Sequence, residues 1–141
     1  MTQYVVDASV AVKWFIRDDA EESNINQAIQ LLMLAQRGDA AFLQPPHWVS
    51  EVAAVLARLE PKTVSRSIGA LLALAFVKTT GKSNHYQRAI SMAVKLDHHL
   101  FDTFYHAVAL EENGTLITAD KRYYDKAKVM GAIVMLEDFE G

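Results

Sequence analysis

The feature that most constrains the fold is the alternation of short β-rich runs with longer helical stretches along the 141 residues. Five runs are rich in Val, Ile, Leu, Phe and Thr without strict polar alternation, which is typical of strands buried on both faces. They span 3–6, 41–44, 76–79, 115–118 and 132–136. Helices are predicted over 10–17, 23–37, 46–59, 63–74, 86–95, 101–113 and 121–130. This order predicts an α/β fold with three α/β/α layers around a short parallel sheet of four to five strands.

Composition is that of an ordinary globular protein, with 51% hydrophobic and 22% charged residues. The longest uncharged apolar run, 68–77, is about half as long as a membrane span requires, and no secretion signal is visible at the N-terminus. The chain has no cysteine, which excludes disulfides and thiolate metal sites and favours a reducing cytoplasm. We therefore expect one compact domain over 1–141, cytoplasmic and not in a membrane.

The net charge of −3 is unusual for a protein that binds nucleic acid. If four acids serve as metal ligands, however, 13 acidic residues remain against 14 basic ones. A bound cation would also offset the charge of the acids that hold it. The charge balance therefore neither supports nor excludes a polyanionic substrate.

Two aspartates follow predicted strands. Asp7 comes directly after the first strand, and Asp120 comes just after the fourth. In open parallel sheets the ligand crevice lies beyond the carboxyl ends of the strands, where the strand order reverses. Each aspartate alone has an equally good alternative role, because Asp at a strand–helix junction is a favoured helix N-cap.

Two further acids lie on predicted helices in apolar surroundings. Glu51 falls three residues after Trp48 and four before Val55, within or beside the apolar face of its helix. A carboxylate in such a place is costly unless it is paired or bound to a metal, although it could also lie at the margin and reach solvent. Asp102 opens its helix beside Phe101, and helix capping is the alternative there too.

The set of four acids points to a hard divalent cation. Carboxylates brought close together repel one another and cannot all stay ionised unless a cation joins them. Mg²⁺ and Mn²⁺ prefer oxygen ligands, and such an ion can orient a phosphodiester and lower the pKa of a water molecule. No nucleophilic side chain is then required.

Other kinds of site are not indicated. The five histidines form no two-histidine zinc motif, and the rings of the adjacent His98 and His99 are expected to point in different directions. His106 lies one helical turn after Asp102, but a core or surface role is the favoured interpretation. The sequence contains no glycine-rich phosphate loop and no G-x-S-x-G motif.

Four segments resemble the PIN-domain family, and in particular the VapC-type toxins of bacterial toxin–antitoxin pairs. Together they span nearly the whole chain, and their order and separations make the likeness specific. They are Val5-Val6-Asp7-Ala8-Ser9, Glu51 on the helix after the second strand, the stretch 100–105 around Asp102, and the stretch 116–123 around Thr118-Ala119-Asp120. Phe101 and the Tyr123-Tyr124 pair depart from the usual residues, which bears on the shape of the site and not on its ligands.

The resemblance implies a Mg²⁺-dependent endoribonuclease, with Mn²⁺ as a substitute ion. Its metal-binding and catalytic carboxylates would be Asp7, Glu51, Asp102 and Asp120. The hydroxyls of Ser9 and Thr118 would hold these carboxylates in place. Three basic residues would contact RNA phosphates, although solvation at the surface is a competing role for each: Lys13, Lys121 and Arg122.

The resemblance also implies partners: an RNA substrate, a small antitoxin protein and a second copy of the chain. The predicted helix 10–17 is apolar on nearly every side, which is typical of a buried or an interfacial helix. Trp14 and Phe15 are interface candidates on this ground, and a core role for one of them is equally compatible. The alternative function is a catalytically silent binding or regulatory module on the same scaffold, because fold does not fix function.

Overall fold

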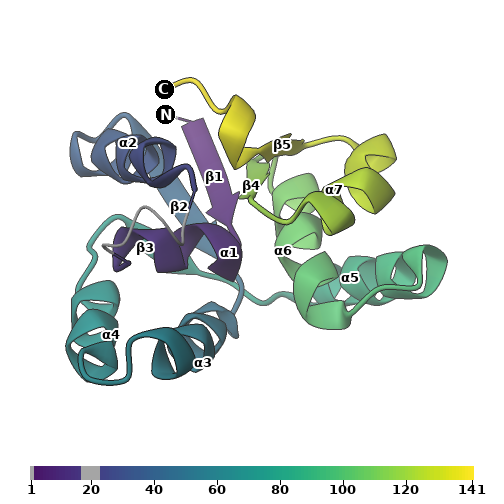
Figure 1. Cartoon of the computed structure of the whole chain (residues 1–141). Coiled ribbons are helices and arrows are strands. Elements are labelled where there is room, and N and C mark those ends of the chain that lie inside the picture. The colour runs from purple at the N-terminus through teal and green to yellow at the C-terminus, as the bar shows by residue number, and fades with distance from the viewer. Residues whose placement is uncertain (1, 17–22) are drawn as a thin grey trace.

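The computed structural model describes residues 2–16 and 23–141. Its five strands form one sheet in the order β3-β2-β1-β4-β5, and every pairing is parallel (Figure 1). The strands are β1 (Thr2–Val6), β2 (Ala40–Gln44), β3 (Val77–Thr79), β4 (Thr115–Thr118) and β5 (Ile133–Met135). All five predicted strands are confirmed to within one residue at each end, and so is the predicted α/β architecture.

Seven α-helices and three short 3₁₀ turns surround the sheet in the described part of the chain. The helices are α1 (Ala8–Ala11), α2 (Ile25–Gln36), α3 (Trp48–Leu59), α4 (Val64–Leu72), α5 (Ser83–Leu96), α6 (Leu100–Glu111) and α7 (Lys121–Ala127). The 3₁₀ turns are η1 (Val12–Trp14), η2 (Lys128–Met130) and η3 (Leu136–Asp138). None of these helices combines the length and apolar character that crossing a bilayer requires.

Three helices depart from the sequence prediction by three residues or more at one end: α1, α5 and α7, which ends at Ala127 and is followed by η2 over the rest of its predicted range. The helix expected over 10–17 is a single turn, α1, followed by η1, and its expected last residue, Arg17, lies outside the described residues. Helix α5 begins at Ser83 rather than Tyr86. The cause is His85, which is fully buried and accepts a hydrogen bond from the Lys82 backbone N–H, so the first turn is capped by a side chain.

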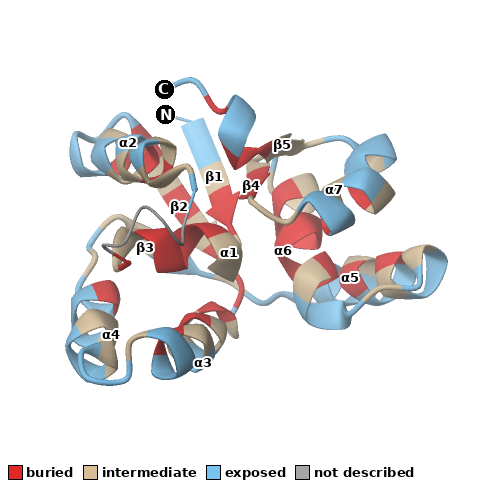
Figure 2. Cartoon of the chain, in the orientation of Figure 1, coloured by how far each residue is buried: buried red, intermediate tan, exposed pale blue. Residues whose placement is uncertain are grey.

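The centre of the sheet is buried on both faces, whereas the start of β1 and most of β3 are exposed (Figure 2). Consecutive strand residues enter different cores: Val5 packs with residues of α3, α5 and α6, whereas Val6 packs with residues of α2 and η3. Leu116 and Ile117 of β4 divide between the two cores in the same way. This explains why the strand sequences are apolar without alternation, because successive side chains point to opposite faces and both faces are covered.

Trp14 belongs to the core. Its ring stacks on Phe42 with centroids 5.5 Å apart, and its indole N–H donates to the Ala28 carbonyl at 2.9 Å. Phe15 is partly buried and lines a surface pocket with Arg66 of α4. Trp14 is itself only partly buried and lines the same pocket, so both interface candidates keep part of their surface exposed.

The topology places the site. The chain runs from β1 to β2 and β3 on one side, and β4 and β5 lie on the other side of β1. The strand order therefore reverses between β1 and β4, and Asp7 and Asp120 follow these two neighbouring strands. Figure 1 shows the arrowhead of β1 pointing toward the side of the molecule on which α3, α5 and α6 lie.

The buried side chain of Gln44 holds β1 and β2 together just before Asp7. The register of the two strands pairs Tyr4 with Phe42 and goes no further. Beyond that point the Gln44 amide takes over, since it donates to the Val6 carbonyl at 2.7 Å and accepts from the Val6 N–H at 2.9 Å. Gln44 is fully buried. The end of β1 therefore stays hydrogen-bonded where the strands separate, which fixes the backbone that carries Asp7.

Candidate active site

Asp7 stands at the N-cap position of α1, but its carboxylate does not cap the helix. Its Oδ1 accepts a hydrogen bond from the Ser9 hydroxyl, and its Oδ2 accepts one from the Thr118 hydroxyl. Ser9 also accepts from the Ala119 N–H at 3.0 Å, and Thr118 accepts from the Asp120 N–H at 3.0 Å. The two hydroxyls thus connect Asp7 to the segment after β4.

The Asp7 carboxyl is strongly perturbed. Burial raises its pKa to about 7, against the lowering effect of the hydrogen bonds from Ser9 and Thr118, and the negative charges of Asp102 and Asp120 raise it further. The carboxylates of Asp102 and Asp120 are therefore close enough to Asp7 to repel it. This is the charge pattern of a site that is stabilised when a cation binds.

Glu51 lies on α3 at the margin of the buried face formed by Trp48 and Val52, with 27% of its side chain exposed. Its Oε1 accepts a hydrogen bond of 2.7 Å from the hydroxyl of Tyr105 on α6. The ring of His47, whose Nε2 is 3.6 Å from the same oxygen, donates to a backbone carbonyl at 2.9 Å. Glu51 is therefore partly buried and hydrogen-bonded. The hydrogen bond offsets the free-energy cost of placing a carboxylate beside an apolar face.

The hydroxyl of Tyr105 lies among the acids. Burial raises the pKa of Tyr105, and the charges of Glu51, Asp7 and Asp102 raise it further. The Tyr105 hydroxyl therefore stays protonated and acts as a neutral donor. Through this one residue, Glu51 is connected to the group around Asp7.

Asp102 lies in the first turn of α6, whose N-cap is His99. One third of its side chain is exposed, and its Oδ2 is 2.7 Å from Nε2 of His98. Asp102 and Asp120 line a pocket of about 350 Å³ together with Arg122. The aromatic neighbour Phe101 is 58% exposed, so Asp102 owes its partial burial to packing on other sides.

Asp120 does serve as a helix cap, because its Oδ1 accepts from the Tyr123 N–H at 3.1 Å. Burial, together with the charges of Asp102, Asp7 and Asp120, raises the pKa of the Tyr123 hydroxyl. Of the core and surface roles that the sequence left open for His106, the structure shows the core role: it is fully buried, and its Nε2–H donates to the Gly131 carbonyl at 2.7 Å. Its Nδ1 lies 2.9 Å from the Tyr123 hydroxyl.

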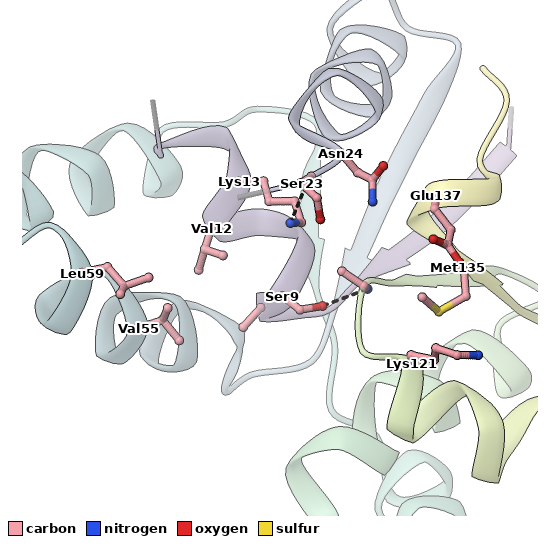
Figure 3. A pocket seen from close by; sticks show the side chains of 12 residues that line it. Ser9, Val12, Lys13, Ser23, Asn24, Val55, Leu59, Lys121, Met135 and Glu137 are labelled. Atoms are coloured by element: carbon pink, nitrogen blue, oxygen red, sulfur yellow. Dashed lines mark hydrogen bonds between the residues drawn. The ribbon is translucent and has the colours of Figure 1, made fainter. Parts of the chain in front are cut away.

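The three basic candidates lie in different surroundings. Lys13 is buried, with 4% exposure, and its ammonium donates to the Ser23 carbonyl at 2.6 Å. Lys121 is exposed and lies 3.4 Å from Asp125. Figure 3 shows Lys13 and Lys121 with Ser9 around a pocket of about 500 Å³ beside the Asp7 segment. A phosphate contact stays a prediction for these two lysines and for Arg122.

Three residues of the site were not foreseen from the sequence: Gln44, His98 and Tyr105. Each acts through a hydrogen bond to the end of β1 or to one of the acids. Only Gln44 could have been singled out from the sequence, because it is a polar residue at the end of an otherwise apolar strand. Tyr105 and Glu51 are 54 residues apart, and no local pattern pairs them.

The four acids are ligands of the type that a hard divalent cation prefers. All four acids offer oxygen, which Mg²⁺ and Mn²⁺ prefer, and the mutual repulsion of Asp7, Asp102 and Asp120 would be relieved by a divalent charge. Among the residues that the structure describes, no three His, Asp or Glu side chains are already close enough to hold an ion. The carboxylates would therefore have to approach one another on binding.

The raised pKa of Asp7 predicts a pH-dependent stability of the metal-free protein. Between pH 5 and about pH 7 the folded state keeps a proton that the unfolded state has lost, and at pH 8 both states have lost it, so stability falls as pH rises from 5 to 8 and levels off above about 7. We expect the free energy of unfolding to fall by about 2–3 kcal/mol over this range relative to Asp7→Asn. Urea titrations in EDTA at both pH values measure this difference, and parallel curves for the two proteins would contradict it.

Comparison with known proteins identifies the family. The model of the PIN domain matches residues 4–129. No curated protein matches the sequence significantly. Similar solved structures include Mycobacterium tuberculosis VapC20, described as a sarcin–ricin loop cleaving toxin, with 15% identity, coverage of 86% of this chain and 93% of that one, and a TM-score of 0.67.

Two other structures share the fold. PAE2754 from Pyrobaculum aerophilum is 20% identical, with 96% of this chain and 92% of that chain covered and a TM-score of 0.65. VapBC2 from Rickettsia felis, bound to a DNA fragment from the promoter, is 13% identical, with 95% and 97% covered and a TM-score of 0.64. The family match covers most of the sequence, and the sheet order and the acids at its switch point agree with it. The chain therefore belongs to the PIN domain family.

Proposed function

We propose that this protein is a divalent-metal-dependent endoribonuclease and the toxin of a toxin–antitoxin pair. The observation that carries the proposal is the buried Asp7 carboxyl, whose pKa is raised by burial and by the charges of Asp102 and Asp120. Membership of the PIN family and the likeness in fold to the VapC20 toxin support it. RNA is the proposed substrate, and the proposed location is the cytoplasm.

In this proposal Asp7, Asp102 and Asp120 hold Mg²⁺ or Mn²⁺, and Glu51 completes the acidic set. When bound, the ion supplies positive charge to the phosphodiester and lowers the pKa of a water molecule. The hydroxyls of Ser9 and Thr118 keep both oxygens of Asp7 oriented. Tyr105 keeps Glu51 in place from the neighbouring helix. The protein thus contributes fixed carboxylates rather than a nucleophile.

The test is cleavage of a structured RNA by purified protein, with Mg²⁺ or Mn²⁺ and with EDTA. We expect cleavage only with the metal, and an antitoxin that co-purifies has to be removed first under denaturing conditions. Asp125→Asn is the matched control, because Asp125 is an exposed acid paired with Lys121 on α7. Metal-dependent cleavage lost in Asp102→Asn and kept in Asp125→Asn supports the proposal.

A catalytically silent module is the alternative outcome. It would show no cleavage with either ion and no shift in melting temperature at millimolar Mg²⁺ or Mn²⁺. A ligand that binds the folded state and not the unfolded state raises the apparent stability, so a metal site that exists must give a shift in melting temperature. The two functions are therefore separated by one thermal titration.

We also propose a homodimer, with α5 as its contact. Tyr86, Ile90 and Val94 are spaced four apart on this helix and are 43%, 47% and 79% exposed. A stripe of uncharged, partly exposed side chains suits an isologous contact, in which the same surface serves both copies. We expect Ile90→Glu with Val94→Glu to halve the mass measured by light scattering, whereas Val129→Glu, at an exposed valine outside the stripe, leaves it unchanged. A monomeric wild type would contradict this.

A further inference from the structure

The side chain of His98 forms a well-packed hydrogen bond with Asp102, one of the four acids of the site. It lies in the turn between α5 and α6, where Asp97 has a positive φ of 48°. Its side chain is only 7% exposed, and its ring packs on Tyr123 with centroids 4.9 Å apart. From this place Nε2 reaches Oδ2 of Asp102 at 2.7 Å. A buried ring held on both sides has few other orientations, so this hydrogen bond is a fixed feature of the pocket.

The partner of Nδ1 shows which of the two ring nitrogens of His98 carries the hydrogen. Nδ1 of His98 lies 3.4 Å from the ammonium of Lys126, and an ammonium group can only donate. Nδ1 is therefore the acceptor, and Nε2 carries the hydrogen that it donates to Asp102. Lys126 is itself held by the Asp97 carbonyl at 3.0 Å. Residues of α7, the turn and α6 thus form one chain of hydrogen bonds that ends on Asp102.

We propose that His98, oriented by Lys126, is a positioning residue that fixes the Asp102 carboxylate for metal binding. The inference rests on the proposed function, because it takes Asp102 as a metal-binding carboxylate. With Oδ2 held by His98, the carboxylate cannot rotate freely, and Oδ1 is the oxygen that remains for an ion. A hydrogen bond of this kind lowers the entropic cost of binding and orients the ligand.

The experiment measures Mn²⁺ binding directly, from the electron paramagnetic resonance signal of the free ion, in wild type and five variants. Loss of a partner of this kind typically costs about 10–100-fold in metal affinity, so we expect that increase in the Kd of His98→Ala. His98→Gln restores a donor at the position of Nε2 and is expected within about 3-fold of wild type. His98→Asn, whose amide reaches only the position of Nδ1, is expected to resemble the alanine variant. Lys126→Met is expected to weaken binding less than His98→Ala does.

His99→Ala is the matched control for the ring. His99 is exposed, and although its ring lies edge-on to that of His98 with centroids 5.8 Å apart, no hydrogen bond among the described residues joins it to a carboxylate. We expect its Kd for Mn²⁺ to equal that of wild type. Melting temperatures of all variants identify any that fail to fold, and the glutamine variant keeps the test decisive if alanine is too disruptive.

The outcomes separate this inference from the proposed function. Weak binding by the alanine variant with rescue by glutamine supports the positioning role. Equal binding by wild type and His98→Ala, or equal losses in the alanine and glutamine variants, overturns it while leaving the nuclease proposal intact. A wild type that binds no Mn²⁺ overturns both, and that result is visible before any variant is made.

Discussion

Replacing Asp7 by Asn is expected to reduce metal-dependent RNA cleavage by about a thousandfold or more and, at the same time, to stabilise the metal-free protein. The loss reflects removal of a charged oxygen ligand, for which about 4 kcal/mol of transition-state stabilisation corresponds to a factor of 10³. The gain follows from the raised pKa of Asp7, because a neutral amide of the same shape carries no desolvated charge.

The loss of cleavage and the gain in stability are measured on the same purified protein. Cleavage is measured at saturating Mn²⁺, and melting curves are recorded at pH 8 in EDTA and in millimolar Mn²⁺. We expect the ion to raise the melting temperature of wild type and not that of Asp7→Asn. Asp125→Asn, at an exposed acid, is expected to behave as wild type in both measurements. An active Asp7→Asn variant would remove Asp7 from the proposed mechanism.

Replacing Gln44 by Leu is expected to be the most destabilising single change in the site. The leucine has nearly the same size, but it leaves the Val6 N–H and carbonyl without partners in the core. Each buried polar group left unsatisfied costs about 1–3 kcal/mol, so we expect a loss of about 2–5 kcal/mol in the free energy of unfolding. For a chain of this size that corresponds to roughly 10 °C in melting temperature.

The position of Gln44 makes this a test of function as well as of stability. Val6 directly precedes Asp7, so loosening the end of β1 is expected to lower cleavage at temperatures where the variant is still folded. Gln36→Leu, at an exposed glutamine at the end of α2, is the matched control and is expected to change the melting temperature little. Equal stability of Gln44→Leu and wild type in urea titrations would show that the amide bridge is dispensable.

The strands and the two acids that follow them could be predicted because the information is local. Val5 and Val6 are apolar on both faces, and the acid after such a strand lies at the ligand-binding edge by a general rule of parallel sheets. The same rule places Asp120 beside Asp7, since β1 and β4 are neighbours at the switch point. For His106 the sequence left a core role and a surface role open, and the structure shows the core role.

The partners of the acids could not be predicted, because they come from distant segments or from small details of the backbone. Glu51 meets Tyr105 across 54 residues, and Gln44 meets Val6 across 38. His98 reaches Asp102 from a turn in which Asp97 adopts a left-handed conformation. The sequence also left open which aspartates cap a helix. In the structure the side chain of Asp120 caps its helix, whereas that of Asp7 does not.

The central claim is that Asp7 anchors a group of carboxylates that binds a divalent cation. The most direct measurement is anomalous scattering from crystals of the wild-type protein grown with millimolar Mn²⁺. The account predicts a manganese peak within about 2.2 Å of carboxylate oxygens of Asp7, Asp102 and Asp120, with these side chains drawn closer together than they are without the ion. A map with no peak beside Asp7, or with the ion bound only elsewhere on the protein, would contradict it.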